Sequence, residues 1–166
     1  AQLDTGDIKI AMRSFRRALE IEPNHPEYHL NVGNAFRDSG DLDLALENYQ
    51  EAIKIDPDYA PVHWNQSLLY LTLEDFQNGW PKYEWRWKGS EILTDGYLST
   101  SRPVWDSSTR ERVFLWPEQG LGDEIMFASM IPDLRLLCSK LIVQVDERLI
   151  PLFKRSFSDD IDFRSR

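Results

Sequence analysis

Hydrophobic, small and polar residues recur with a fixed period through the first half of the chain. Residues of one class return every 34 positions: Gly6 and Gly40; Ala11, Ala45 and Gly79; Phe15, Tyr49 and Tyr83; Ala18 and Ala52; Pro23 and Pro57. Small and aromatic residues at such fixed offsets are typical of stacked helix–turn–helix repeats. Because such stacks build curved surfaces that hold partners and seldom catalyse reactions, the period favours a binding function.

The second repeat, Pro26–Tyr59, shows how one unit is built. Its first helix is predicted to span Pro26–Ser39, and Gly40 ends it because glycine takes the left-handed conformation at a helix C-terminus. Asp41 is expected to cap the second helix through its side chain. That helix carries an amphipathic stripe and stops at Pro57. The stripe consists of Leu42, Ala45, Tyr49, Ala52 and Ile53.

Two kinds of side chain set the distance between these helices. Gly33 and Ala45 are small enough for the helices to approach closely, and the rings of Phe36 and Tyr49 fill the space between layers. In these residues the chain resembles the tetratricopeptide repeat, which implies an α-solenoid of about two and a half repeats. The first repeat is represented by its second helix alone, since Leu3–Gly6 matches the end of a first helix. In the second repeat, the residues that match the tetratricopeptide pattern are Gly33, Phe36, Ala45, Tyr49, Ala52 and Pro57.

The third repeat, which runs from Ala60, departs from this pattern near its end. Arg86 takes the place of a small residue, and Glu91 takes that of the proline. Since an arginine cannot nest under a following helix, the stack is predicted to end near Lys88. Four large rings of the last helix either dock against the segment that follows or form a platform for a ligand. They are Trp80, Tyr83, Trp85 and Trp87.

Two asparagines, Asn31 and Asn65, occupy the same position of consecutive first helices. In tetratricopeptide proteins these helices line the concave side, and the pair resembles the asparagine ladder of O-linked N-acetylglucosamine transferases, which grips an extended peptide backbone. An amide suits this task because it both donates and accepts hydrogen bonds. The alternative is that the asparagines tie turns or face solvent. The same groove is predicted to contain Leu30, Asn34, Arg37 and Trp64.

The pattern changes after residue 89. Residues 90–112 have neither a helical nor a strand period and are interpreted as a linker anchored by Trp105. Residues 113–166 predict a βαβ unit with parallel strands at 113–116 and 141–145, and with a kink at Pro132 in the helix between them. A second helix from Glu147 and a third strand from Ile161 are expected to follow. The predicted fold class is therefore mainly α, with repeats over 1–89 followed by a partial Rossmann-like α/β segment.

A glycine-containing string, residues 118–123, separates the first predicted strand from its helix. It reads Glu118, Gln119, Gly120, Leu121, Gly122 and Asp123. The string resembles bacterial proteins in which tetratricopeptide repeats precede a domain similar to family 9 glycosyltransferases, the heptosyltransferase group. Gly79–Trp87 and Pro103–Asp106 fit the same architecture. The resemblance implies that Asp123 is the base and that a nucleotide-sugar is used by the parent protein, whereas this segment alone is expected to be inactive.

The role of Asp123 has a second interpretation. A carboxylate at a helix start either accepts the proton of an acceptor hydroxyl, with its charge stabilised by the helix dipole, or simply caps the helix. Phosphate binding by Gly120 and Gly122 is disfavoured, because Asp123 and Glu124 place two negative charges in the first turn.

Charge and composition narrow the range of partners. The net charge of −9 argues against a nucleic-acid partner. The basic residues Arg13, Arg16 and Arg17 have helical spacing and are interpreted as a solvated face. Cys138 has no partner for an internal disulfide, and its leucine neighbours predict a buried thiol. No metal or cofactor is expected to bind.

Three further expectations concern the surroundings of the protein. No apolar stretch approaches the roughly 20 residues of a membrane span, and no signal peptide is recognised, which predicts a cytoplasmic protein without membrane contact. His29 and His63 recur at one repeat position and are predicted to pack against the neighbouring helix rather than to bind a metal. The unpaired edge of a short sheet, or the open face of the repeat stack, permits self-association.

The sequence thus supports two hypotheses of different class. The first is a scaffold whose concave groove binds a protein or peptide segment. The second is the leading part of a sugar transferase, whose repeats recruit the acceptor and whose Asp123 acts as the base. The first is favoured for the chain itself, because the catalytic constellation of the second is incomplete.

Overall fold

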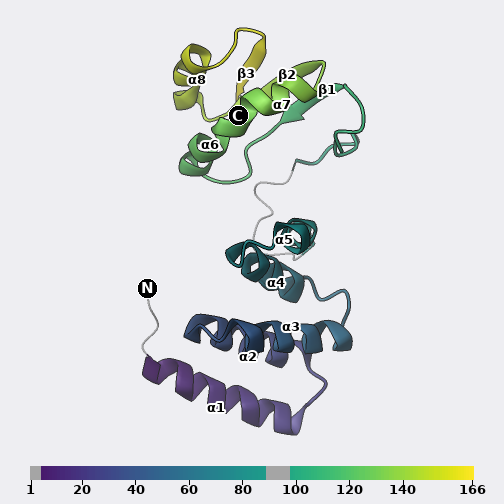
Figure 1. Cartoon of the computed structure of the whole chain (residues 1–166), viewed down its shortest axis with the longest axis vertical. Coiled ribbons are helices and arrows are strands. Elements are labelled where there is room, and N and C mark those ends of the chain that lie inside the picture. Colours follow the sequence, from purple (N-terminus) through teal and green to yellow (C-terminus); the bar gives the residue numbers. More distant parts are fainter. Residues whose placement is uncertain (1–4, 89–97) are drawn as a thin grey trace. The chain divides into compact units, whose positions relative to one another are not determined.

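A computed structural model of the protein describes residues 5–88 and 98–166, apart from the side chains of residues 5–9 and 11. The chain divides into two compact units, Ala1–Leu93 and Thr94–Arg166. Among its described residues, the first unit contains helices and the second contains a three-stranded sheet with short helices (Figure 1). Leu3, Asp4, Glu91 and residues 90–97 of the predicted linker lie outside the described residues.

Paired helices build the first unit, which we call the helical unit. Helix α2 packs along α3, and α4 packs along α5, as the second and third repeats predict (Figure 1). Gly6, expected to end a preceding helix, instead lies in the first turn of α1, since glycine weakens a helix by only about 1 kcal/mol. The elements are α1 (Thr5–Ile21), α2 (Pro26–Ser39), α3 (Leu42–Ile55), α4 (Ala60–Thr72), α5 (Phe76–Tyr83) and the 3₁₀ turn η1 (Glu84–Trp87).

The turn between α2 and α3 depends on Gly40. Its φ angle of 87° lies in the left-handed region, as the sequence predicts. The N–H group of Gly40 donates to the carbonyl of Arg37 at 3.1 Å, and that of Asp41 donates to the carbonyl of Phe36 at 2.9 Å. These two bonds form a Schellman motif, which satisfies carbonyls that the helix itself leaves open.

The start of α3 differs from the prediction. Asp41 precedes the helix but makes no side-chain capping bond, because its carboxylate accepts a hydrogen bond from the hydroxyl of Ser39 at 3.0 Å instead. The predicted cap is therefore wrong at this position. One repeat later, Asp75 does cap α5, since its carboxylate accepts from the backbone N–H of Asn78 at 3.2 Å.

Close contact at Gly33 holds α2 against α3. A Cβ atom added there would lie 2.5 Å from Cε1 of Tyr49 and 3.2 Å from the carbonyl oxygen of Ala45. Tyr49 and Ala45 are fully buried, so the tyrosine ring fills the space that the glycine leaves. Phe36 packs against the same core, which confirms the predicted layer of rings. The buried core consists of Leu30, Ala45, Tyr49, Ala52, Val62 and Leu69.

Replacing Gly33 with alanine is expected to destabilise the helical unit by about 1–3 kcal/mol, because the ring of Tyr49 would have to leave a packed position. This loss exceeds the gain of about 0.5–1 kcal/mol that alanine brings to a helix interior. Gln50→Ala, on the exposed side of α3, is the control and should change stability by less than about 0.5 kcal/mol. Urea unfolding followed by far-UV circular dichroism measures both; equal stability of G33A and the parent chain would disprove the tight contact.

The second unit, which we call the α/β unit, is a parallel sheet with crossover helices. Strands β1 (Arg112–Leu115), β2 (Lys140–Val145) and β3 (Ile161–Ser165) follow one another in the order β1-β2-β3, and both neighbouring pairs are parallel. The predicted βαβ arrangement and the third strand from Ile161 are confirmed. After β2, the 3₁₀ turn η4 (Glu147–Leu149) leads into α8 (Ile150–Ser156).

The crossover between β1 and β2 is broken near Pro132. Helix α6 (Leu121–Phe127) passes through the 3₁₀ turn η3 (Ala128–Met130) into α7 (Ile131–Leu137). Pro132 falls in the first turn of α7, where a missing N–H group leaves no hydrogen bond unmade. The predicted kink is therefore present as a change of helix type rather than as a bend in one helix.

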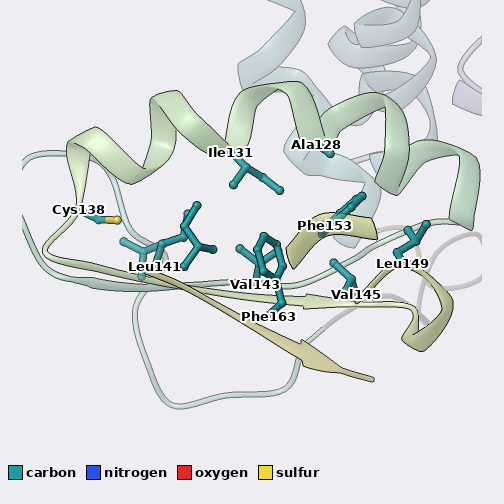
Figure 2. Packing of buried hydrophobic residues seen from close by; sticks show 11 residues of the cluster. Ala128, Ile131, Cys138, Leu141, Val143, Val145, Leu149, Phe153 and Phe163 are labelled. Carbon is teal, nitrogen blue, oxygen red and sulfur yellow. The ribbon is translucent and has the colours of Figure 1, made fainter. Parts of the chain in front are cut away.

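The core of the α/β unit lies between the sheet and the helices. In Figure 2, Ala128 and Ile131 point from the crossover toward the sheet, and Phe153 of α8 lies near Phe163 of β3. Cys138 is fully buried, as its neighbours predict. The ring of Trp105 packs against this cluster and ties the segment before β1 to it. The buried members are Val113, Ala128, Ile131, Cys138, Leu141, Val143, Val145, Leu149, Phe153, Ile161 and Phe163.

Candidate functional site

Consecutive first helices, α2 and α4, are joined by a pair of polar side chains. Nη1 of Arg37 donates to Oδ1 of Asn65 at 2.8 Å, and Nδ2 of Asn65 donates to the carbonyl of Pro61 at 2.8 Å. The structure thus brings two of the predicted groove residues together. Because an amide offers two donor and two acceptor positions, Asn65 keeps one of each for another partner.

The other groove residues of α2 have different surroundings. Oδ1 of Asn34 accepts a hydrogen bond from the hydroxyl of Tyr49 at 2.7 Å, so Asn34 faces the second helix of its own repeat. Asn31 is half-buried, and its side chain has no hydrogen bond to any residue that the structure describes. Leu30 is buried in the core, where its aliphatic side chain is removed from water. The prediction that it lies in the groove is therefore wrong.

The hydroxyl of Tyr49 titrates far from its ordinary range. Burial raises the pKa of Tyr49 from 10.0 to about 12, although the positive charge of Arg37 opposes this shift. At neutral pH the hydroxyl is therefore a neutral donor to Asn34. Tyr49 thus connects the core of the repeat to the polar side chain of Asn34. The sequence period did not indicate this role.

Tyr49→Phe tests this connection through the pH dependence of stability. At pH 7 the variant is expected to be about 1 kcal/mol less stable, because it lacks the bond to Asn34. The pKa in the folded state lies above that of the unfolded chain, so the parent loses stability as pH rises from 10 toward 12, by about 1 kcal/mol at pH 11. Phenylalanine has no hydroxyl to titrate, so the variant does not lose this stability. In urea unfolding, the difference in free energy of unfolding between the parent and the variant should therefore vanish near pH 11. A difference that is the same at pH 7 and pH 11 would contradict the raised pKa.

The aromatic residues of α5 and η1 are covered by cations of the same unit. The guanidinium of Arg86 lies 4.4 Å from the ring centroid of Tyr83 and 4.3 Å from that of Trp87, and the Arg86 side chain is only 9% exposed. Arg86 was predicted only to be unable to nest under a following helix. The structure shows in addition that its guanidinium is buried against aromatic faces of its own segment. The alternation of tryptophan and arginine over residues 85–87 was the sequence signal that could have indicated this burial.

One ring of α4 joins this cluster. The ring of Trp64 lies 4.8 Å from that of Tyr83, and Trp80 meets the same tyrosine edge-on at 5.5 Å. Trp80 remains 51% exposed. Trp64 precedes Asn65 in α4, and its ring contacts the aromatic cluster of α5 and η1. We call the set Asn31, Asn34, Arg37, Trp64 and Asn65 the α2–α4 surface.

The two histidines make the same contact one repeat apart. Nε2 of His29 lies 3.1 Å from the carbonyl oxygen of Pro23, and Nε2 of His63 lies 2.8 Å from that of Pro57. The imidazole N–H thereby ties each first helix to the proline that ends the preceding repeat. Burial lowers the pKa of His63, and the charge of Lys82 near its ring adds to this effect. These contacts agree with packing between repeats.

In the α/β unit, the string 118–123 leads from β1 into α6. Gly120 precedes the helix with an extended backbone and provides no side-chain cap. Asp123 lies in the first turn of α6, half-buried, and its carboxylate has no hydrogen bond to any described residue. Capping by Asp123 is therefore not observed. A Cβ atom added at Gly122 would meet no heavy atom within 4 Å, and the carbonyl of Gln119 accepts a hydrogen bond from Arg166 at 2.7 Å.

The neighbouring carboxylate, Glu124, has the structural role in this region. Oε2 of Glu124 accepts from the backbone N–H of Asp146 at 2.8 Å, and Oε1 pairs with Arg166 at 2.6 Å. The Glu124 side chain is only 6% exposed. It joins α6 to the carboxyl ends of β2 and β3. Glu124 was predicted only as one of two negative charges in the first turn, and the structure shows in addition that its charge is paired with Arg166.

Glu124→Ala is expected to destabilise the α/β unit by about 1–3 kcal/mol, because it leaves the N–H group of Asp146 and the guanidinium of Arg166 without their shared acceptor. Asp123→Ala, one residue earlier, is the matched control and should change stability by less than about 0.5 kcal/mol. Hydrogen exchange of the amides of β2 and β3 reports on this unit separately. Equal protection in the two variants would remove the proposed role of Glu124.

Comparison with known proteins identifies the repeats. Residues 33–73 match the family model described as TPR repeat, and residues 1–25 match the model described as Tetratricopeptide repeat. Protein FlbA of Caulobacter vibrioides (strain ATCC 19089 / CIP 103742 / CB 15) is 35% identical to the chain over 98 residues. This alignment covers 55% of the chain and 16% of the length of FlbA. The chain thus carries tetratricopeptide repeats, and such repeats imply a protein-interaction scaffold.

The two matched family models end before the α/β unit. Neither matched segment reaches residues 113–166, and the name of FlbA does not refer to sugar transfer. The three-stranded parallel sheet is consistent with a partial α/β segment, whereas the glycosyltransferase resemblance has no support here. Within residues 5–88 and 98–166, no helix is long and apolar enough to cross a membrane.

Proposed function

We propose that the helical unit binds an extended segment of a partner protein on the α2–α4 surface. The observation that carries this proposal is that the amides of both asparagines on this surface have open hydrogen-bonding positions. Asn31 has an amide without a hydrogen bond to a described residue, and Asn65 is held in place by Arg37 with one donor and one acceptor position left. Amide groups with open donor and acceptor positions are suited to pairing with the backbone of a peptide.

The neighbouring residues give this surface its rigidity. The hydroxyl of Tyr49 holds the side chain of Asn34 through a hydrogen bond. Arg37 is held by Asn65 and by Asp38, whose carboxylate lies 3.0 Å from Nη2 of Arg37. Side chains that are already ordered lose less conformational entropy when a partner binds. Trp64 adds an aromatic face for an apolar side chain of the bound segment.

Replacing both Asn31 and Asn65 with alanine is expected to weaken binding of a partner peptide roughly tenfold, since each lost hydrogen bond contributes about 0.5–1.5 kcal/mol. Peptides selected from a random phage-displayed library on the immobilised chain provide the probe, and isothermal titration calorimetry gives the dissociation constant. The control is the double alanine variant of Asn24 and Asn48, which lie outside the α2–α4 surface. If the two variants have equal affinities, the asparagines do not bind the peptide.

Sugar transfer is the second candidate function, and it concerns a longer protein. Its support is Asp123, which follows β1 at the carboxyl end of the sheet and has no hydrogen bond to a described residue. Such a carboxylate is available to accept the proton of an acceptor hydroxyl. Asp123→Asn in the full-length gene product should abolish transfer from a nucleotide-sugar without loss of folding. Undiminished transfer would exclude Asp123 as the base.

A further inference from the structure

A pocket of about 830 Å³ lies between α1 and the turn that joins α2 to α3. It is separate from Asn31, Asn65 and Trp64, none of which lines it. The helix α1 contributes a basic side, and the end of α2 together with the turn after it contributes an aromatic ring and polar groups. The lining residues are Met12, Arg13, Arg16, Arg17, Glu20, Phe36, Ser39 and Asp41.

The three arginines on this pocket are exposed cations without a partner among the described residues. Arg13 stands three residues before Arg16 and four before Arg17, a spacing at which like charges on a helix repel one another. In the α/β unit, by contrast, several arginines are each paired with a carboxylate. Examples are Arg135, Arg148, Arg164 and Arg166. The basic cluster on α1 is therefore a local exception in a chain of net charge −9.

The lining of the pocket indicates the chemistry of its ligand. Guanidinium groups bind carboxylates through two parallel hydrogen bonds, and Met12 and Phe36 offer apolar surface beside them. Glu20 and Asp41 add negative charge to the rim, so the positive surface of the pocket is confined to the arginine side of α1. The volume is that of a site for a few side chains.

We propose that this pocket binds an acidic segment of a partner protein, in which carboxylate side chains flank an apolar one. The carboxylates pair with Arg13, Arg16 and Arg17, and the apolar side chain lies against Met12 and Phe36. The proposal goes beyond the function of the α2–α4 surface, because it adds a second contact with a different specificity. The arginines thus form a binding face, whereas their spacing alone indicated only a solvated one.

The probe for this site is a fluorescein-labelled peptide with the sequence Asp-Glu-Phe-Glu-Asp-Leu, and the readout is fluorescence anisotropy with the complete chain of 166 residues. The triple variant Arg13→Gln, Arg16→Gln and Arg17→Gln should bind it about tenfold more weakly or worse. Glutamine is a good helix former, so α1 is retained, which circular dichroism verifies.

A control variant removes the same charge elsewhere. Arg102, Arg112 and Lys140 are exposed residues of the α/β unit, and their replacement by glutamine should change the affinity by less than about twofold, because they do not line the pocket and physiological salt screens exposed charges. An equal loss in both triple variants would mean attraction by net charge alone and would overturn the proposal. The proposal is also overturned if the peptide shows no saturable binding up to about 1 mM.

Two further peptides and one further variant complete the test. The neutral peptide Asn-Gln-Phe-Gln-Asn-Leu should not bind, and equal binding of it would exclude carboxylate recognition. A hexanucleotide RNA that binds more tightly than the acidic peptide through the same arginines would assign the pocket to phosphates instead. The double alanine variant of Asn31 and Asn65 should bind the acidic peptide unchanged, so failure of either site is distinguishable from failure of the other.

Discussion

The packing of the Tyr49 ring over Gly33 is the contact on which the helical unit depends. It sets the distance between α2 and α3, because no Cβ atom could stand at Gly33 with the ring in place. It also carries the tyrosine hydroxyl through the core to Asn34, where a buried polar group finds its partner. From there the polar residues Arg37 and Asn65 extend the arrangement to α4. One apolar contact therefore fixes the position of the polar groups that a partner would meet.

The α/β unit is organised around a different interaction. Its sheet and crossover helices enclose an apolar core, and Glu124 fastens the first turn of α6 to the ends of the second and third strands. The position of Asp123 follows from this arrangement, since its neighbour is committed to the fold while Asp123 itself has no hydrogen bond to a described residue. Two adjacent carboxylates thus have distinct surroundings, which a sequence pattern does not distinguish.

The repeats, the parallel sheet and the break near Pro132 could be predicted because each follows from periodicity or from the covalent structure of one residue. The left-handed Gly40 was predictable for the same reason. The misses concern polar side chains with several possible partners. Asp41 bonds to Ser39 rather than to the helix, and Leu30 joins the core rather than the groove. Such choices depend on which groups tertiary packing brings within reach, and hydrophobic period does not contain that information.

The central claim is that the α2–α4 surface holds a peptide through its asparagine side chains. The most direct measurement is an NMR titration of the side-chain amide resonances with a peptide selected on the protein. The account predicts that the resonances of Asn31 and Asn65 shift on binding while those of Asn24 and Asn48 do not. Saturable binding that shifts Asn48 on α3 and leaves Asn31 and Asn65 unchanged would contradict it.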